Sequence, residues 1–142
     1  MDSQLNAEGL ARLIVYLTLQ SDVLTIERMS ESLGIPPDTT KKTGQLNSAG
    51  KPFDKNSWTV KAESYVPENA DDFVVGMNAC LRQLLSRITE HGEAFRKLAA
   101  SEEATLLIGI TAKHVPPIVI DGDILETMCS LKVRQFEVDI II

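Results

Sequence analysis

Apolar and polar residues fall into segments along the chain whose spacing predicts four main strands. Residues 10–20, "LARLIVYLTLQ", are almost continuously apolar, so we expect a central strand that is covered on at least one face. Residues 57–63, "SWTVKAE", alternate between apolar and polar positions, which is typical of a half-exposed strand. Residues 104–112 and 133–142 form the other two, and the three final isoleucines suggest that the last strand is buried to its end. Gly109 within the third strand predicts a bulge or the close approach of another backbone.

Helical spacing predicts four helices between these strands. A short amphipathic helix is expected at 26–33, with Thr25 as its N-cap and Gly34 as its stop. The segment 69–91 carries an apolar stripe with a 3.6-residue period, formed by Phe73, Val74, Met77, Leu81, Leu84, Leu85 and Ile88. A shorter helix is expected at 93–100. A last helix is expected to begin at Asp123, with Glu126 completing a capping box.

This order of elements predicts an α+β domain. The order is β-α-β-α-α-β-α-β, with an optional short edge strand at 115–120 before the last helix. We expect a single sheet of about four to five strands, with helices packed mainly on one face. Residues 1–9 carry no period and are expected to form a flexible tail, and residues 10–142 form one domain.

Composition and charge indicate which binding partners and which cellular location to expect. The net charge of −6 over 142 residues argues against non-specific binding of nucleic acid or of a membrane surface. No apolar stretch approaches the roughly 20 residues of a membrane helix, and the first residues lack the pattern of a signal peptide. A cytoplasmic protein is therefore expected. Cys80 and Cys129 are expected to be small buried thiols.

The connection 36–56 contains the most distinctive charge pattern. Residues 41–61 hold five lysines against one aspartate, a net charge of +4 on an otherwise acidic chain. Such a segment could attract an anionic ligand or an acidic protein. The candidate binding residues are Lys41, Lys42, Lys51, Lys55 and Trp58. The alternative interpretation is a solvated loop, with Trp58 as a core residue.

Other kinds of site find little support in the sequence. Gly44 and Gly50 are one residue too far apart for a nucleotide-binding P-loop, and Pro52 stands where the Mg²⁺-binding hydroxyl belongs. His91 and His114 have no partner at metal-ligand spacing. We therefore predict no catalytic residue, no metal and no cofactor, and the sequence favours a non-catalytic domain over an enzyme.

Several short motifs resemble one family. They are "LGIPP" at 33–37, the later Gly44 and Trp58, and the closing unit that ends in "VDI" at 138–140. In this order they resemble the bacterial DUF4279 domain, a domain of unknown function, over roughly residues 11–142. The resemblance implies a compact α+β domain and supplies no catalytic residues. The terminal "DIII" departs from the pattern, since relatives tend to place an aromatic residue there.

Two functional hypotheses follow. The first is a non-catalytic bacterial protein-interaction domain, with an immunity or regulatory role, that binds another protein through 36–56 and an exposed sheet face. The second is a domain that binds a small anionic ligand through the lysine-rich segment 41–61. A homodimer is also possible. The two hypotheses differ in whether the four candidate lysines should converge on a hollow or spread over a flat surface.

Overall fold

The computed structural model describes residues 10–67, 69–112 and 118–140. Its elements, in chain order, are β1 (Ala11–Ser21), α1 (Ile26–Leu33), β2 (Thr39–Lys41), β3 (Asn56–Val66), α2 (Ala70–Thr89), α3 (Gly92–Ala100), β4 (Thr105–Ala112), α4 (Gly122–Ser130) and β5 (Gln135–Ile140). The tail predicted at 1–9 lies outside the described residues.

The five strands form one mixed sheet in the order β2-β3-β1-β4-β5. β1 is antiparallel to both of its neighbours, β2 is antiparallel to β3, and β5 runs parallel to β4. The predicted α+β architecture is confirmed, and β1 is the central strand that its apolar sequence predicts. The fifth strand is β2, within the connection 36–56. The optional strand at 115–120 is not found at 118–120, and its remaining residues lie outside the described part.

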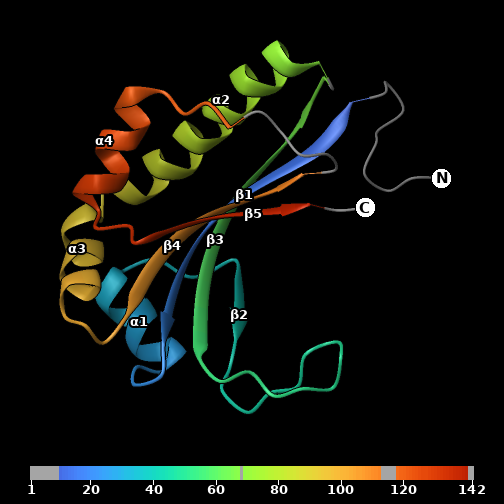
Figure 1. The fold of residues 1–142 in the computed structure, drawn as a ribbon. Coiled ribbons are helices and arrows are strands. Elements are labelled where there is room, and N and C mark those ends of the chain that lie inside the picture. Colours follow the sequence, from blue (N-terminus) through green and yellow to red (C-terminus); the bar gives the residue numbers. More distant parts are fainter. Residues whose placement is uncertain (1–9, 68, 113–117, 141–142) are drawn as a thin grey trace.

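All four helices lie on one side of the sheet, as Figure 1 shows. The period of two along β1 explains this division: Leu13, Val15 and Leu17 point toward the helices and are fully buried. α2 packs across β3 and β1, and α3 packs against β4. On the other side of the sheet, no described helix covers the strands. We call this side the open face.

Trp58 belongs to the helix-covered core, as the core interpretation of this residue expects. Its side chain is fully buried, and its ring meets that of Phe95 edge-on, with the centroids 5.7 Å apart. The indole Nε1 donates a hydrogen bond of 3.1 Å to the hydroxyl of Ser30 in α1. The tryptophan therefore ties α1 and α3 to β3.

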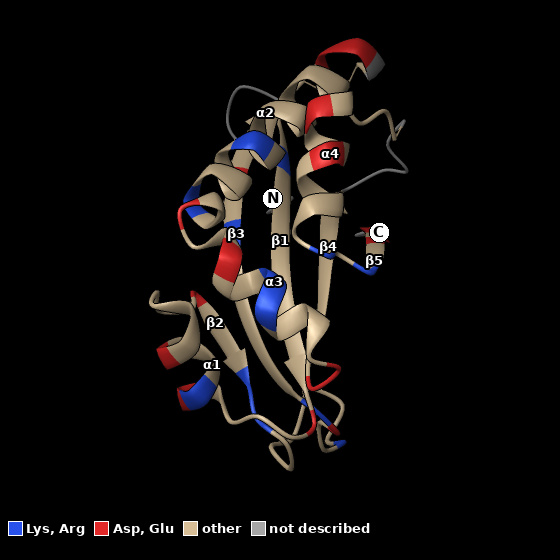
Figure 2. Ribbon diagram, turned by 90° about the vertical axis from the view of Figure 1, so that its left-hand side faces the viewer, with Lys and Arg blue, Asp and Glu red and all other residues tan. Residues whose placement is uncertain are grey.

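The segment after β2 folds back as a hairpin, which we call the lysine hairpin (residues 42–55). Gly44 donates to the carbonyl of Phe53, and Phe53 donates to that of Gln45, both at 2.9 Å. Gly44 and Gly50 have φ angles of 86° and 77°, a left-handed conformation that glycine adopts at low cost. These glycines serve as turn residues. Figure 2 shows Lys and Arg positions along the chain that follows β2.

The helix ends match the sequence signals in two cases and differ in a third. Thr25 caps α1 and Gly34 closes it with a φ of 76°, as predicted. The capping box at Asp123 is wrong, because α4 begins at Gly122 after the N-cap Asp121. The carboxylates of Asp121 and Asp123 instead bind Arg82 of α2. This contact lowers the pKa of Asp123.

Three further expectations can be compared with the structure. Cys80 is buried as expected, and burial raises the pKa of its thiol to about 11, whereas Cys129 is exposed, contrary to the prediction. Val138 in the last strand is 38% exposed at the sheet edge, and the burial predicted for the three final isoleucines lies outside the described residues. Among the described residues, no helix is long and apolar enough to cross a membrane.

Asn78 is a buried polar residue that fastens the segment before α4 to α2. Its side chain is 2% exposed and donates to the carbonyls of Val74 and Val119 at 2.9 and 2.8 Å. Its Oδ1 accepts a hydrogen bond of 2.9 Å from the amide of Asp121. Each polar atom of the amide thus has a partner, which is what a buried polar group requires.

We predict that Asn78→Ala lowers the free energy of unfolding by about 2 kcal/mol, because it leaves the Val119 carbonyl and Asp121 amide without their partner. Chemical denaturation measures the change. Gln83→Ala, at an exposed position of the same helix, is the control and should change stability by less than about 0.5 kcal/mol. Equal stabilities of the two variants would contradict the fastening role of Asn78.

Candidate functional site

The open face carries a groove of about 480 Å³ in the middle of the sheet. The strand register places alternate residues of all five strands on this face. The groove is lined by Ile14, Tyr16, Thr18, Gln20, Thr39, Lys41, Ser57, Thr59, Lys61, Leu107, Glu137 and Asp139. Hydroxyl and charged groups dominate this lining, whereas the face beneath the helices is almost entirely apolar. A volume of this size falls within the usual range of ligand sites.

Tyr16 forms one wall of the groove together with two carboxylates of β5. Its hydroxyl donates to Asp139 Oδ2 at 2.5 Å and lies 3.2 Å from Glu137 Oε2. Burial raises the pKa of this phenol far above its usual value, and the hydrogen bond to Asp139 raises it further. The hydroxyl has one proton, so it can donate fully to only one carboxylate at a time.

Gly109 makes this wall possible. Tyr16 stands on β1 and the carboxylates on β5, so the tyrosine must cross β4, which lies between them. Gly109 is directly opposite Tyr16 in the register, and a Cβ there would lie 2.2 Å from the Cζ atom of Tyr16. The glycine expected to mark a close approach therefore does so. The approaching group is a side chain, rather than a backbone.

The opposite wall is basic, and the floor between the walls is lined with hydroxyls. Lys61 of β3 pairs with Tyr16 in the register, and Lys41 of β2 pairs with Ser57, four residues along β3 from Lys61. On the floor, the hydroxyls of Thr18 and Thr59 share a hydrogen bond of 2.8 Å. The arrangement offers hydrogen-bond donors and a positive charge on one side and two carboxylates on the other.

The structure separates the residues predicted to form a binding site. Lys41 lines the groove, and its Nζ lies 5.4 Å from the centre of the Phe53 ring. Lys42 points elsewhere and pairs with Glu27 of α1 at 3.5 Å. Lys51 and Lys55 lie in the exposed lysine hairpin, outside the lining of the groove. Trp58 is in the core and cannot meet a ligand on the open face.

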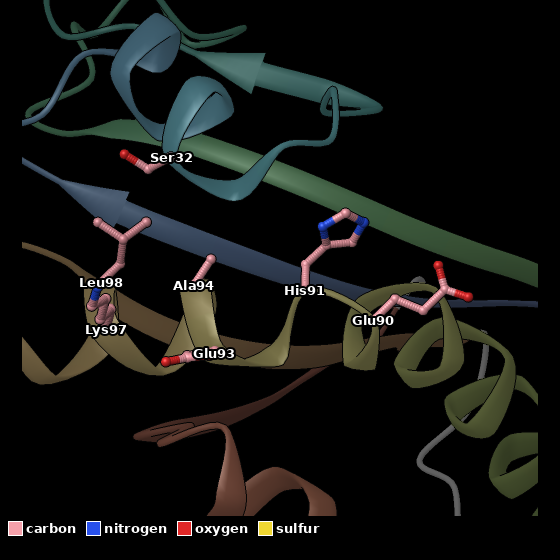
Figure 3. A pocket seen from close by; sticks show the side chains of 7 residues that line it. All are labelled: Ser32, Glu90, His91, Glu93, Ala94, Lys97 and Leu98. Atoms are coloured by element: carbon pink, nitrogen blue, oxygen red, sulfur yellow. The ribbon is translucent and has the colours of Figure 1, made fainter.

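A second, larger hollow of about 640 Å³ lies between α1 and α3. In Figure 3, His91, Ala94 and Leu98 point toward α1, which contributes Ser32. The charged side chains of this hollow and Ser32 are all exposed, so solvent already satisfies their polar groups. The open-face groove is the better candidate because it gathers buried or partly buried polar groups from three strands, β1, β3 and β5.

The groove offers charged groups and hydroxyls to a ligand. His91 does not line it, and in the described part of the chain no group of three or more His, Cys, Asp and Glu could hold a metal ion. His114 itself lies outside the described residues. Carboxylates, ammonium groups and hydroxyls can bind a polar ligand through charge-assisted hydrogen bonds.

Sequence reasoning missed Tyr16, Ser57, Glu137 and Asp139 as site residues. Each lies at an alternating position of a predicted strand, so the face it shares could be read from the sequence. The order of the strands in the sheet could not be read from the sequence. That order places β5 next to β4 and within reach of Tyr16.

We predict that Gly109→Ala lowers the free energy of unfolding by about 2 kcal/mol, because the added methyl group collides with the Tyr16 ring. In a Tyr16→Ala background the same change should cost much less, since the colliding ring is gone. A double-mutant cycle from chemical denaturation measures the difference. An equal cost in both backgrounds would show that the ring does not occupy this space.

We predict that Tyr16 resists ionisation in the folded protein. Tyr65→Phe leaves Tyr16 as the sole tyrosine, and its near-ultraviolet absorbance then reports tyrosinate directly. Because the folded pKa lies above the ordinary 10.0, this group stabilises the fold fully below pH 10 and less as the pH rises further. Titration near the ordinary pKa in the folded state would contradict the hydrogen bond to Asp139.

Comparison with known proteins identifies the family. The family described as "Domain of unknown function (DUF4279)" matches residues 11–142, from the start of β1 to the last residue. No curated protein and no solved structure shows significant similarity to the chain. The predicted resemblance is therefore confirmed over nearly the whole sequence, and the chain belongs to the DUF4279 family.

Proposed function

We propose that this protein is a non-catalytic interaction domain that binds another protein through its open face and the adjoining lysine hairpin. The observation that carries the proposal is the side of the five-stranded sheet that no described helix covers, which holds a polar groove. A hollowed face with opposed charges suits a partner whose charges are complementary.

The lysine hairpin supports the same proposal. Its tip presents Leu46 with 64% of its surface exposed, next to several lysines on an otherwise acidic protein. The local positive charge of the hairpin suits an acidic surface of a partner protein. β2 joins the hairpin directly to the open face, so one partner could touch both. An immunity or regulatory role in bacteria is consistent with such a domain and remains part of the proposal.

The second hypothesis, a small anion held by the four candidate lysines, is the weaker proposal. It requires Lys41, Lys42, Lys51 and Lys55 to converge on one hollow. Lys41 alone among the four lines the groove, and Lys42 pairs with Glu27. The groove also contains Glu137 and Asp139, which repel an anion.

We predict that Thr59→Arg weakens partner binding, because a long charged side chain would fill the centre of the groove. The immobilised protein is exposed to a lysate of its source organism, and retained proteins are compared between variants by mass spectrometry. Binding should weaken at least about tenfold for the partner that the wild type retains.

The control is Val75→Arg, which places the same side chain at a position of α2 that is 68% exposed. Circular dichroism verifies that both variants are folded. A partner retained equally by Thr59→Arg and the wild type, or lost with Val75→Arg alone, would contradict binding at the open face.

A further inference from the structure

The two walls of the groove carry opposite charges that do not neutralise each other. Lys41 and Lys61 stand on β2 and β3, and Glu137 and Asp139 stand on β5. β3 and β5 are three strand spacings apart, about 14 Å between backbones. None of the ion pairs among the described residues joins these lysines to these carboxylates. The groove therefore has a separate positive side and a separate negative side.

The negative side gathers two carboxylates around a single hydroxyl. Glu137 and Asp139 both lie within hydrogen-bonding distance of the Tyr16 oxygen, which has one proton to offer. Glu137 also accepts a hydrogen bond of 3.0 Å from the side-chain amide of Gln135, which is a neutral group. Two negative charges held this close, with neutral donors as partners, attract a cationic group.

The floor of the groove contains a buried hydroxyl that has no partner among the described residues. Ser57 is 7% exposed, and the register places it on the open face between Gln20 and Lys41. Its Oγ takes part in none of the hydrogen bonds of the described residues, while its neighbour Thr59 is paired with Thr18. A buried hydroxyl left unpaired costs free energy, which a bound polar group can recover.

We propose that the groove binds a zwitterionic group: an ammonium or guanidinium at Glu137 and Asp139, and a carboxylate at Lys41, Lys61 and the Ser57 hydroxyl. The inference rests on the proposed function in taking the open face as the binding surface. Charge complementarity selects this ligand, because a pure anion meets the carboxylates of β5 and a pure cation meets the lysines. The distance between the walls favours a ligand whose two charges are several bonds apart.

The same chemistry occurs in a free basic amino acid and in a protein segment that carries one basic and one acidic side chain. Two probes separate these sources. L-arginine carries both charges in one small molecule. A blocked arginyl-glycyl-glutamyl tripeptide carries both charges on side chains only, as a partner protein would. Tighter binding of the tripeptide assigns the groove to a protein segment, and tighter binding of L-arginine assigns it to a free amino acid.

The test is a titration of the isotope-labelled protein, followed by the chemical shifts of its backbone amides. We expect L-arginine or the tripeptide to shift amides of the open-face strands. Agmatine, which is arginine without its carboxylate, should bind about tenfold more weakly than L-arginine. Inorganic phosphate, an anion alone, should bind more weakly than either zwitterion.

Matched variants locate the two ends of the ligand. Glu137→Gln combined with Asp139→Asn should weaken binding of the zwitterions about tenfold, and Lys41→Gln combined with Lys61→Gln should do the same. The control is Glu90→Gln combined with Glu93→Gln, which removes two exposed carboxylates near α3 and should leave binding within about twofold. Unchanged amide shifts elsewhere in the sheet verify the fold.

Three results would overturn the inference: no shift with either zwitterion, equal binding of agmatine and L-arginine, or shifts confined to the helices. If the zwitterions fail while partner capture still depends on Thr59, the inference falls and the proposed function stands. If capture is indifferent to Thr59→Arg, the proposed function falls whatever the titration shows.

Discussion

The open face depends on one steric relation, the passage of the Tyr16 side chain over Gly109. A side chain on the central strand reaches the carboxylates of β5 only if the strand between them offers no side chain of its own. The glycine costs the strand some stability, because it packs no side chain and loses more freedom on folding. In return, the tyrosine bonds to Asp139 and closes one side of the groove.

The packed core on the helix-covered side of the sheet holds the strands that carry Tyr16 and Gly109 in place. β1 is hydrogen-bonded on both edges and contributes fully buried residues to the core, so the position of Tyr16 is fixed by strands rather than by loops. α2 lies so close to β3 that a Cβ at Gly76 would come within 2.3 Å of Val66. Groups on both walls of the groove are therefore held by paired backbone, which lowers the cost of ordering them for a ligand.

Most of the fold could be predicted from the sequence because local patterns of apolar and capping residues indicate its helices and strands. The apolar run of β1, the stripe of α2 and the Thr25 and Gly34 signals of α1 each predict an element that the structure contains. The ends of the helices were predicted less accurately than the helices themselves. Asp123 has the residue type of a cap, but its carboxylate forms its contacts with Arg82, which is distant in sequence.

The candidate site was harder to predict because it is built across strands. Lysine composition singled out 41–61, yet Lys42 and Trp58 turn away from the open face while Lys41 and Lys61 remain on it. Alternation along a strand decides these directions, and it was visible in the sequence. The convergence of Tyr16 with Glu137 was not visible, since it requires the parallel pairing of β5 with β4.

The most direct measurement is a nuclear Overhauser experiment between the ring protons of Tyr16 and the α protons of Gly109. Strong cross peaks are expected, because the ring lies against the position where a Gly109 Cβ would stand. Cross peaks between the Tyr16 ring and solvent-facing neighbours, without any to Gly109, would show that the tyrosine does not cross β4. The groove would then lack the wall on which the binding account depends.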